Sequence, residues 1–140
     1  MSFDYAILIF IAMLMLHFFE DFVLQHLSHL CDYKQKSWWK ENAPDKMYKN
    51  DYKYCLIAHS FCWSTIVMLP VIIGYFYTNH NLLYRLFMIL IFITNVAGHF
   101  VIDDAKANKR NINLIQDQLC HISMIFATWV IFYSLIEVIL

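Results

Sequence analysis

The stretch LLYRLFMILIFITNVAGHFVIDDAKANKR, residues 82–110, begins as an apolar run and ends in a group of cations. Residues 82–104 are long enough for a helix that crosses a bilayer, which needs about 20 apolar residues. His99, Asp103 and Lys106 nevertheless lie in or just after the last turns of this segment. Ionisable side chains at membrane depth cost about 2.5 to 3.5 kcal/mol each on insertion scales, so their presence indicates a buried polar site.

The whole chain has the composition of an integral membrane protein. Of its 140 residues, 61% are hydrophobic and 18% are aromatic, and the mean hydropathy is +0.51, above the range of soluble domains. The formal net charge of −1 does not specifically imply a nucleic-acid partner. Four apolar segments, at about residues 3–30, 54–77, 82–104 and 114–140, predict an all-α fold. We expect a single transmembrane domain, residues 1–140, built as a four-helix bundle.

The cations predict an orientation for this bundle. Nine of the ten Lys and Arg residues lie in two connections, residues 32–53 and 105–113, and only Arg85 lies near the tight turn expected at residues 78–81. Because basic loops remain in the cytoplasm, both connections should be cytoplasmic and both termini should lie on the outer side. The expected location is therefore the inner, cytoplasmic membrane. Pro70 should kink the second helix, since proline has no backbone N–H.

Polar residues inside the predicted spans recur at one spacing. Three pairs of a histidine and an aspartate are each four residues apart, so the members of a pair lie on one helix face. With a rise of about 1.5 Å per residue along helices of alternating direction, these pairs and one further histidine fall in one layer near the cytoplasmic surface. The sequence therefore predicts a single polar site. Its residues are His17 and Asp21, His59, His99 and Asp103, and Asp117 and His121.

Four imidazoles and three carboxylates are typical of a site for a divalent cation. Zn is favoured, with Mn or Fe as alternatives, because Mg and Ca prefer oxygen ligands alone. Seven candidate ligands exceed one tetrahedral site, so either two ions share the pocket or some carboxylates orient imidazoles instead. A bound ion makes hydroxide available near neutral pH, and hydrolysis is the simplest reaction for this set.

Neighbouring polar residues complete a hypothesis for the reaction. Asp117 is assigned to catalysis as a general base, and Lys106 is assigned to catalysis by holding an anionic group such as phosphate. Gln25 and Gln118 are expected to position the substrate together with Lys106. Glu20 is expected to face lipid headgroups or solvent. The predicted activity is hydrolysis of a phosphorylated or lipid-linked substrate.

The same residues resemble a known family. HFFEDFVLQ at residues 17–25, HS at 59–60, HFVIDDAK at 99–106 and DQLCH at 117–121 are similar, in this order, to motifs of small bacterial and phage membrane proteins called domain of unknown function 3307. The resemblance covers nearly the whole chain, but Trp63 stands where the family pattern has a second histidine. The HxxxD pairs also resemble ligand pairs of zinc-dependent phospholipase C and S1/P1 nuclease enzymes, which favours phosphoester hydrolysis.

Two other classes of function are compatible with the sequence. A non-enzymatic membrane protein, for example a phage product that binds a host membrane protein, would use the polar layer for interhelical hydrogen bonds. A proton or metal-ion conductor would need polar residues through the outer half as well, and that half is nearly bare of them. The partners expected are the lipid bilayer, a small substrate, and a host membrane protein or a second copy of the chain.

Overall fold

The computed structural model describes residues 2–76 and 82–139, and this part of the chain is helical, without strands. The first half begins with a long helix whose winding changes near its end. Helix α1 (Phe3–Phe19) continues through the π-helical turn η1 (Glu20–Leu24) into α2 (Gln25–Leu27), and the short helices α3 (Leu30–Tyr33) and α4 (Lys36–Asn42) follow.

Within the described residues, three helical runs are long and apolar enough to cross a membrane, which indicates a membrane protein. They are Phe3–Leu27, Leu82–Ala107 and Leu114–Ile136. The last two correspond to α7 (Leu82–Ala107) and to most of α8 (Leu114–Ile139). A 3-10 turn, η2 (Lys46–Tyr48), follows α4.

The segment predicted as one span over residues 54–77 consists of two helices. These are α5 (Asp51–Val67) and α6 (Leu69–Phe76), which are separated at Met68. Pro70 has no N–H to bond to the backbone carbonyl four residues earlier, which accounts for the break. Position 77, the turn expected at residues 78–81 and position 140 lie outside the described residues.

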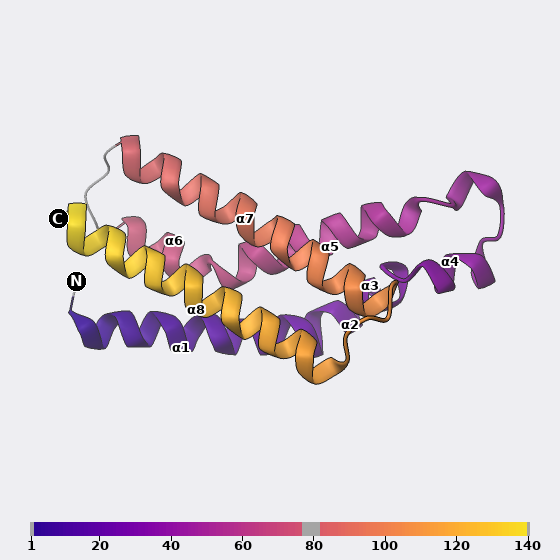
Figure 1. Ribbon diagram of the computed structural model, residues 1–140, viewed down its shortest axis with the longest axis horizontal. Helices are drawn as coiled ribbons and strands as arrows, with labels where there is room; N and C mark the ends of the chain where they lie inside the picture. Colours follow the sequence, from indigo (N-terminus) through magenta and orange to yellow (C-terminus); the bar gives the residue numbers. More distant parts are fainter. Residues whose placement is uncertain (1, 77–81, 140) are drawn as a thin grey trace.

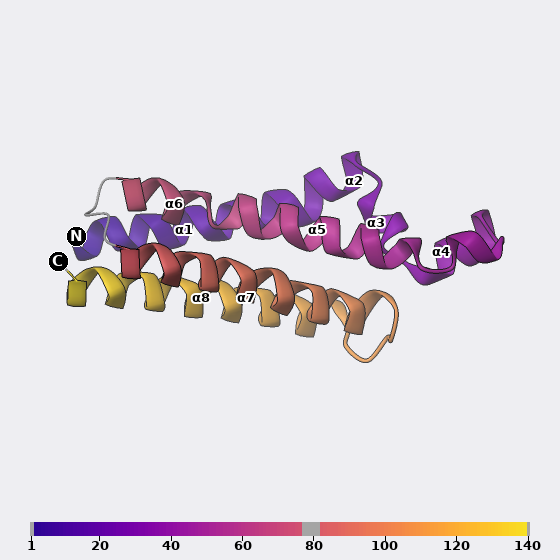
Figure 2. The same ribbon diagram turned by 90° about the horizontal axis from the view of Figure 1, so that it is seen from above.

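The long helices lie lengthwise beside one another in alternating directions (Figure 1). Figure 2 shows them as two layers, α1 with α5 and α6, and α7 with α8. The layers are joined chiefly by packing of α5 on α7, and of α8 on α1. Both ends of the chain lie at one end of the molecule, whereas α2, α3, α4 and the α7–α8 connection lie toward the other (Figure 1).

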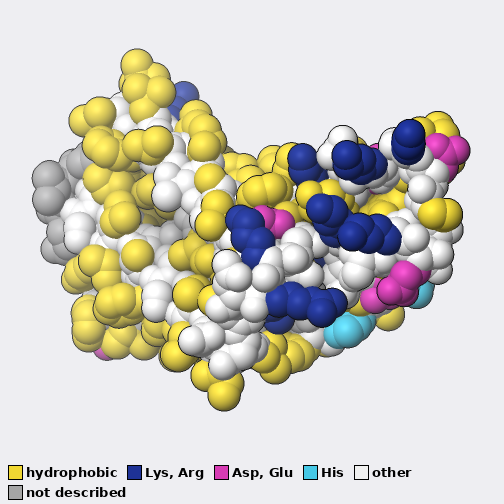
Figure 3. Space-filling view, turned by 45° about the vertical axis from the view of Figure 1, so that its right-hand side comes forward, with side chains coloured by type: hydrophobic (Ala, Val, Ile, Leu, Met, Phe, Trp, Pro, Cys, Tyr) yellow, Lys and Arg dark blue, Asp and Glu magenta, His cyan; other side chains and the backbone are white. Residues whose placement is uncertain are grey.

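Apolar and cationic side chains gather at opposite ends of the molecule. The core near the chain ends is apolar and includes Ile9, Val71 and Phe132. Large apolar side chains also remain exposed on the outer faces, for example Leu8 at 61% and Met15 at 68%, as on a surface that faces lipid. Most of the Lys and Arg side chains visible in Figure 3 gather over the α3–α4 end.

Candidate metal centre

All seven residues of the predicted polar site are buried, and the structure brings them together between the helices. None is more than 5% exposed. Among the described residues, four groups of three side chains place one ligand atom each within 4.8 Å of one another, a geometry that could hold a metal ion. The groups are His17, Asp21 and His121; His59, His99 and Asp103; Glu20, Asp21 and His59; and Asp103, Asp117 and His121.

Asp103 is the carboxylate that most of these imidazoles share. Its Oδ2 lies 3.2 Å from Nε2 of His59 and 3.7 Å from Nε2 of His99, and its Oδ1 lies 3.5 Å from Nε2 of His121. The Nε2 atoms of His59 and His99 are 3.1 Å apart. Helices α5, α7 and α8 therefore present three imidazole nitrogens to one carboxylate.

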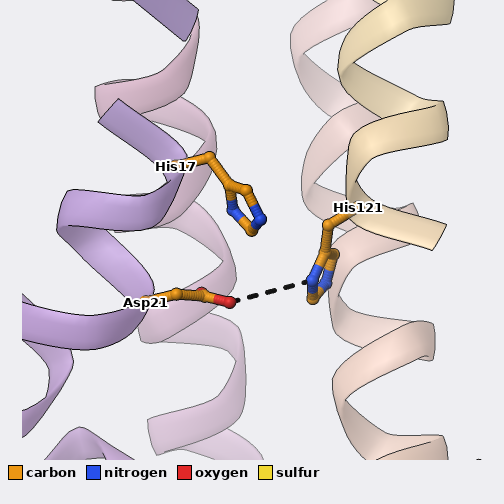
Figure 4. A group of neighbouring side chains, drawn as sticks. All are labelled: His17, Asp21 and His121. Carbon is orange, nitrogen blue, oxygen red and sulfur yellow. Dashed lines mark ion pairs between the residues drawn. The ribbon is translucent and has the colours of Figure 1, made fainter. Parts of the chain in front are cut away.

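His121 also faces the carboxylates of the first helix and of its own helix. Figure 4 shows His17, Asp21 and His121 pointing toward one another from α1, η1 and α8. The Nδ1 atom of His121 is 4.0 Å from Oδ2 of Asp21 and 4.0 Å from Oδ2 of Asp117. These separations exceed hydrogen-bond lengths, so His121 Nδ1 is not hydrogen-bonded to either carboxylate.

Several of these buried atoms have no hydrogen-bond partner among the described residues. A buried polar atom without a partner costs about 1 to 3 kcal/mol, and such atoms are rare in folded proteins. Their concentration at one place fits a cation that several of them would bind together. The unpartnered atoms of the cluster are Glu20 Oε2, His59 Nδ1, His99 Nδ1, Asp117 Oδ1, and both ring nitrogens of His121.

His17 is arranged differently from the other imidazoles, because both of its nitrogens have partners. The indole N–H of Trp63 donates to Nδ1 at 3.0 Å, so Nε2 carries the proton and donates to Oε1 of Gln118 at 3.1 Å. The amide of Gln118 in turn donates to Asp21 at 2.8 Å and to Asp117 at 3.3 Å. In this arrangement His17 and Gln118 orient two carboxylates.

The expectation that Glu20 faces headgroups or solvent is wrong. Its side chain is 2% exposed, and Oε1 lies 3.2 Å from Nδ1 of His59. The cause is η1, in which the N–H of Gln25 bonds to the carbonyl of Glu20, five residues back. A π-helical turn holds more residues than an α-helical turn, so both Glu20 and Asp21 can face the interior. An α-helical period applied to the sequence misses this.

Two lysines reach into the cluster from the cationic end. Lys106 Nζ lies 2.6 Å from Oδ2 of Asp117. Lys34, at the end of α3, lies 2.5 Å from Oδ2 of Asp103 and 2.9 Å from Oε1 of Gln25. Sequence reasoning grouped Lys34 with the other loop cations, since no local spacing marks it. Gln25 also donates a hydrogen bond to a backbone carbonyl of the same helical run.

The charges of the cluster also fit a divalent cation. Because imidazoles that bind a metal must be neutral, the charge to be balanced is that of four carboxylates and two ammonium groups, −4 + 2 = −2. An uncompensated charge in an apolar interior is costly, and a single divalent ion would bring this sum to zero. The carboxylates are those of Glu20, Asp21, Asp103 and Asp117, and the ammonium groups are those of Lys34 and Lys106.

Comparisons with known proteins identify a family and no relative of known activity. No curated protein and no solved structure matched the chain. The model of the family described as Protein of unknown function (DUF3307) matches residues 9–139. That range includes every residue of the cluster and nearly the whole chain. The chain therefore belongs to the DUF3307 family.

Proposed function

We propose that this protein is a membrane-embedded, divalent-metal-dependent hydrolase of a phosphorylated substrate. The observation that carries the proposal is the set of buried, unpartnered ligand atoms around Asp103 and His121. A cation shared by these atoms would satisfy them and would neutralise the excess of carboxylates. The mixture of nitrogen and oxygen ligands favours Zn, with Mn or Fe as alternatives, and one or two ions.

The proposed reaction is attack of water on a phosphoester. A bound ion would act as a Lewis acid that polarises the phosphoryl group and makes water more acidic. Asp117 has one oxygen paired with Lys106 and one without a partner. With one of these oxygens on the ion, the other would accept the proton of the attacking water. The water oxygen forms a new bond to phosphorus as the ester P–O bond breaks. The leaving oxygen then takes the proton from Asp117.

The proposal includes an orientation in the membrane. The long helical segments form a four-helix transmembrane bundle with both termini on the outer side. The cluster then lies on the cytoplasmic side of the inner membrane, below the cationic connections that should remain in the cytoplasm. Substrate would approach from the cytoplasm or from the inner leaflet of the bilayer.

The alternative is a non-enzymatic membrane protein whose polar layer only joins helices. The same molecule contains a polar contact of that kind between α7 and α8. The amide of Asn95 donates to Thr128 Oγ1 at 2.8 Å and to the carbonyl of Ile91 at 2.9 Å, and the Thr128 hydroxyl donates back at 3.2 Å. That pair satisfies itself, whereas the His and Asp cluster leaves several atoms unpaired. This contrast favours the metal site.

Metal analysis of the purified protein tests the proposal. We expect detergent-purified protein, after reconstitution with metal and desalting, to hold Zn, Mn or Fe near stoichiometry, as measured by inductively coupled plasma mass spectrometry. His99→Ala and Asp117→Ala should lose the metal, and Asn95→Ala should keep it as the matched control outside the cluster. Wild-type protein that is folded but empty, or metal that persists in both cluster variants, would overturn the metal site and favour the structural alternative.

A further inference from the structure

Two openings of opposite character reach the cluster. A polar pocket of about 350 Å³ at the cationic end reaches Asp103, and its lining includes Lys34, Lys106 and Arg110. An apolar groove of about 390 Å³ reaches Glu20 from the side of the molecule. The groove lies between the Leu24–Leu30 stretch of the first half and helix α5.

The pocket has the charge and the donors that a phosphate group requires. Arginine binds phosphate oxygens in a bidentate fork, and lysine adds a point charge. Arg110 has no ion pair with a described residue, and its backbone is left-handed, with φ at 56°. That conformation costs a non-glycine residue about 1 to 2 kcal/mol. Burial raises the pKa of the Cys31 thiol in the same pocket, so this thiol adds no negative charge at neutral pH.

The groove has the lining that an acyl chain requires. Leu24, Leu27, Leu30 and Ile66 line it, and Glu20 lies at its inner end. Leu27 is 74% exposed, so the groove is continuous with the apolar outer surface that faces lipid. An acyl chain in the bilayer could therefore enter it sideways without crossing water.

One segment separates the two openings and contributes to both. Between residues 24 and 35 its polar and cationic side chains line the pocket, and its leucines line the groove. The two acids that the openings reach are linked through the buried His59, whose Nδ1 is 3.2 Å from Glu20 and whose Nε2 is 3.2 Å from Asp103. A molecule with a phosphate at one end and an apolar chain at the other could occupy both at once.

We propose that the ligand of this site is a membrane lipid with a terminal phosphate, its phosphate in the cationic pocket and an acyl chain in the groove. The inference of hydrolysis rests on the proposed function, whereas lipid binding does not. A free phosphate ester has the same headgroup chemistry but has no use for the groove. A lipid and a free phosphate ester can therefore be distinguished by how much the acyl chain adds to the binding affinity.

Binding of three probes tests this proposal. Phosphatidic acid carries both features, glycerol 3-phosphate carries only the phosphate, and diacylglycerol carries only the chains. With detergent-purified protein and scintillation proximity, we expect phosphatidic acid to bind at least 10-fold more tightly than either partial probe. Equal affinity for phosphatidic acid and glycerol 3-phosphate would show that the acyl chains do not contribute and would overturn the proposal of a lipid ligand. Equal affinity for phosphatidic acid and diacylglycerol would overturn the role of the phosphate.

Matched variants test where the acyl chain of the lipid binds. Ile66→Trp fills the groove and should weaken phosphatidic acid binding about 10-fold, while glycerol 3-phosphate binding stays unchanged. Ile93→Trp fills a different apolar groove, of about 420 Å³ between α5 and α7, which touches no residue of the cluster, and should have no effect. If Ile66→Trp does not fold, Leu27→Asp changes the same groove at an exposed position. An unchanged affinity in the folded groove variant would refute the assignment.

Zinc content measured on the same samples separates this proposal from the hydrolase. Protein that contains no metal yet binds phosphatidic acid selectively would overturn the hydrolase and support the lipid site. Protein that holds metal near stoichiometry but binds phosphatidic acid no better than glycerol 3-phosphate would overturn the lipid site alone.

Discussion

Replacing Asp103 by Asn should destabilise the protein through Lys34. The substitution keeps the size of the side chain and removes the charge that lies 2.5 Å from the Lys34 ammonium. The side chain of Lys34 is 11% exposed and that of Asp103 is 3% exposed. The variant would therefore leave an ammonium group largely buried and without a carboxylate.

The expected loss follows from this burial. Removing one partner of a buried ion pair costs about 3 to 5 kcal/mol. Lys34 lies at the cationic end, so its aliphatic stem can carry part of the charge toward water, and the lower value applies. We expect the free energy of unfolding of metal-free Asp103→Asn protein to fall by about 3 kcal/mol, which is about two orders of magnitude in the folding equilibrium.

Steric trapping in bicelles measures this free energy, and a double-mutant cycle assigns it. Lys34→Gln alone should also destabilise the protein, because it leaves the buried Asp103 carboxylate without its ammonium partner. The double variant removes both charges of the pair and should recover most of the loss. Asp103→Asn stability within about 0.5 kcal/mol of wild type, or a double variant no more stable than Asp103→Asn, would refute the reasoning.

Three further changes should separate stability from binding. Arg110→Gly should raise the stability by about 1 kcal/mol in thermal unfolding, because glycine accepts the left-handed backbone. The same change should weaken phosphatidic acid binding about 10-fold or more. A loss of stability would contradict the strain assigned to Arg110. Trp63→Phe removes the donor to His17 and should lower zinc affinity by about 10-fold in a chelator competition assay, whereas unchanged affinity would make that hydrogen bond incidental. Glu20→Gln should lower zinc affinity by about 10- to 100-fold through His59, and wild-type affinity would leave Glu20 without a role at the site.

The apolar runs and the cluster were predictable from the sequence for the same physical reason. A helix has a fixed rise and period, so residues four apart share a face, and helices of alternating direction return to the same depth. That reasoning placed His99 with Asp103 and Asp117 with His121, which lie together in the structure. It also found the apolar segments that become the candidate spans.

The features that were missed depend on departures from this regular period or on distant parts of the chain. The π-helical turn that turns Glu20 inward has no signature in hydrophobic spacing. Lys34 follows a left-handed residue, His29, whose φ is 56°, a conformation that glycine would have signalled more strongly than histidine does. Trp63 was noted only as a missing histidine, and its role as the donor to His17 needs the packed helices.

Charge balance makes metal and phosphate binding dependent on one another. In the structure both lysines of the cluster are paired with carboxylates, Lys34 with Asp103 and Lys106 with Asp117. An ion bound by those carboxylates would release both ammonium groups toward the pocket, where a phosphate could take them. Zinc should therefore raise the affinity for glycerol 3-phosphate.

By linkage, the phosphate must raise the affinity for zinc by the same factor, and titration calorimetry in both orders measures the two factors. An increase of about 10-fold corresponds to about 1.4 kcal/mol of coupling. Lys34→Gln should reduce that coupling, since one of the released charges is then absent. If zinc and phosphate bind independently in the wild-type protein, the lysines do not exchange partners, and the pocket and the cluster are separate sites.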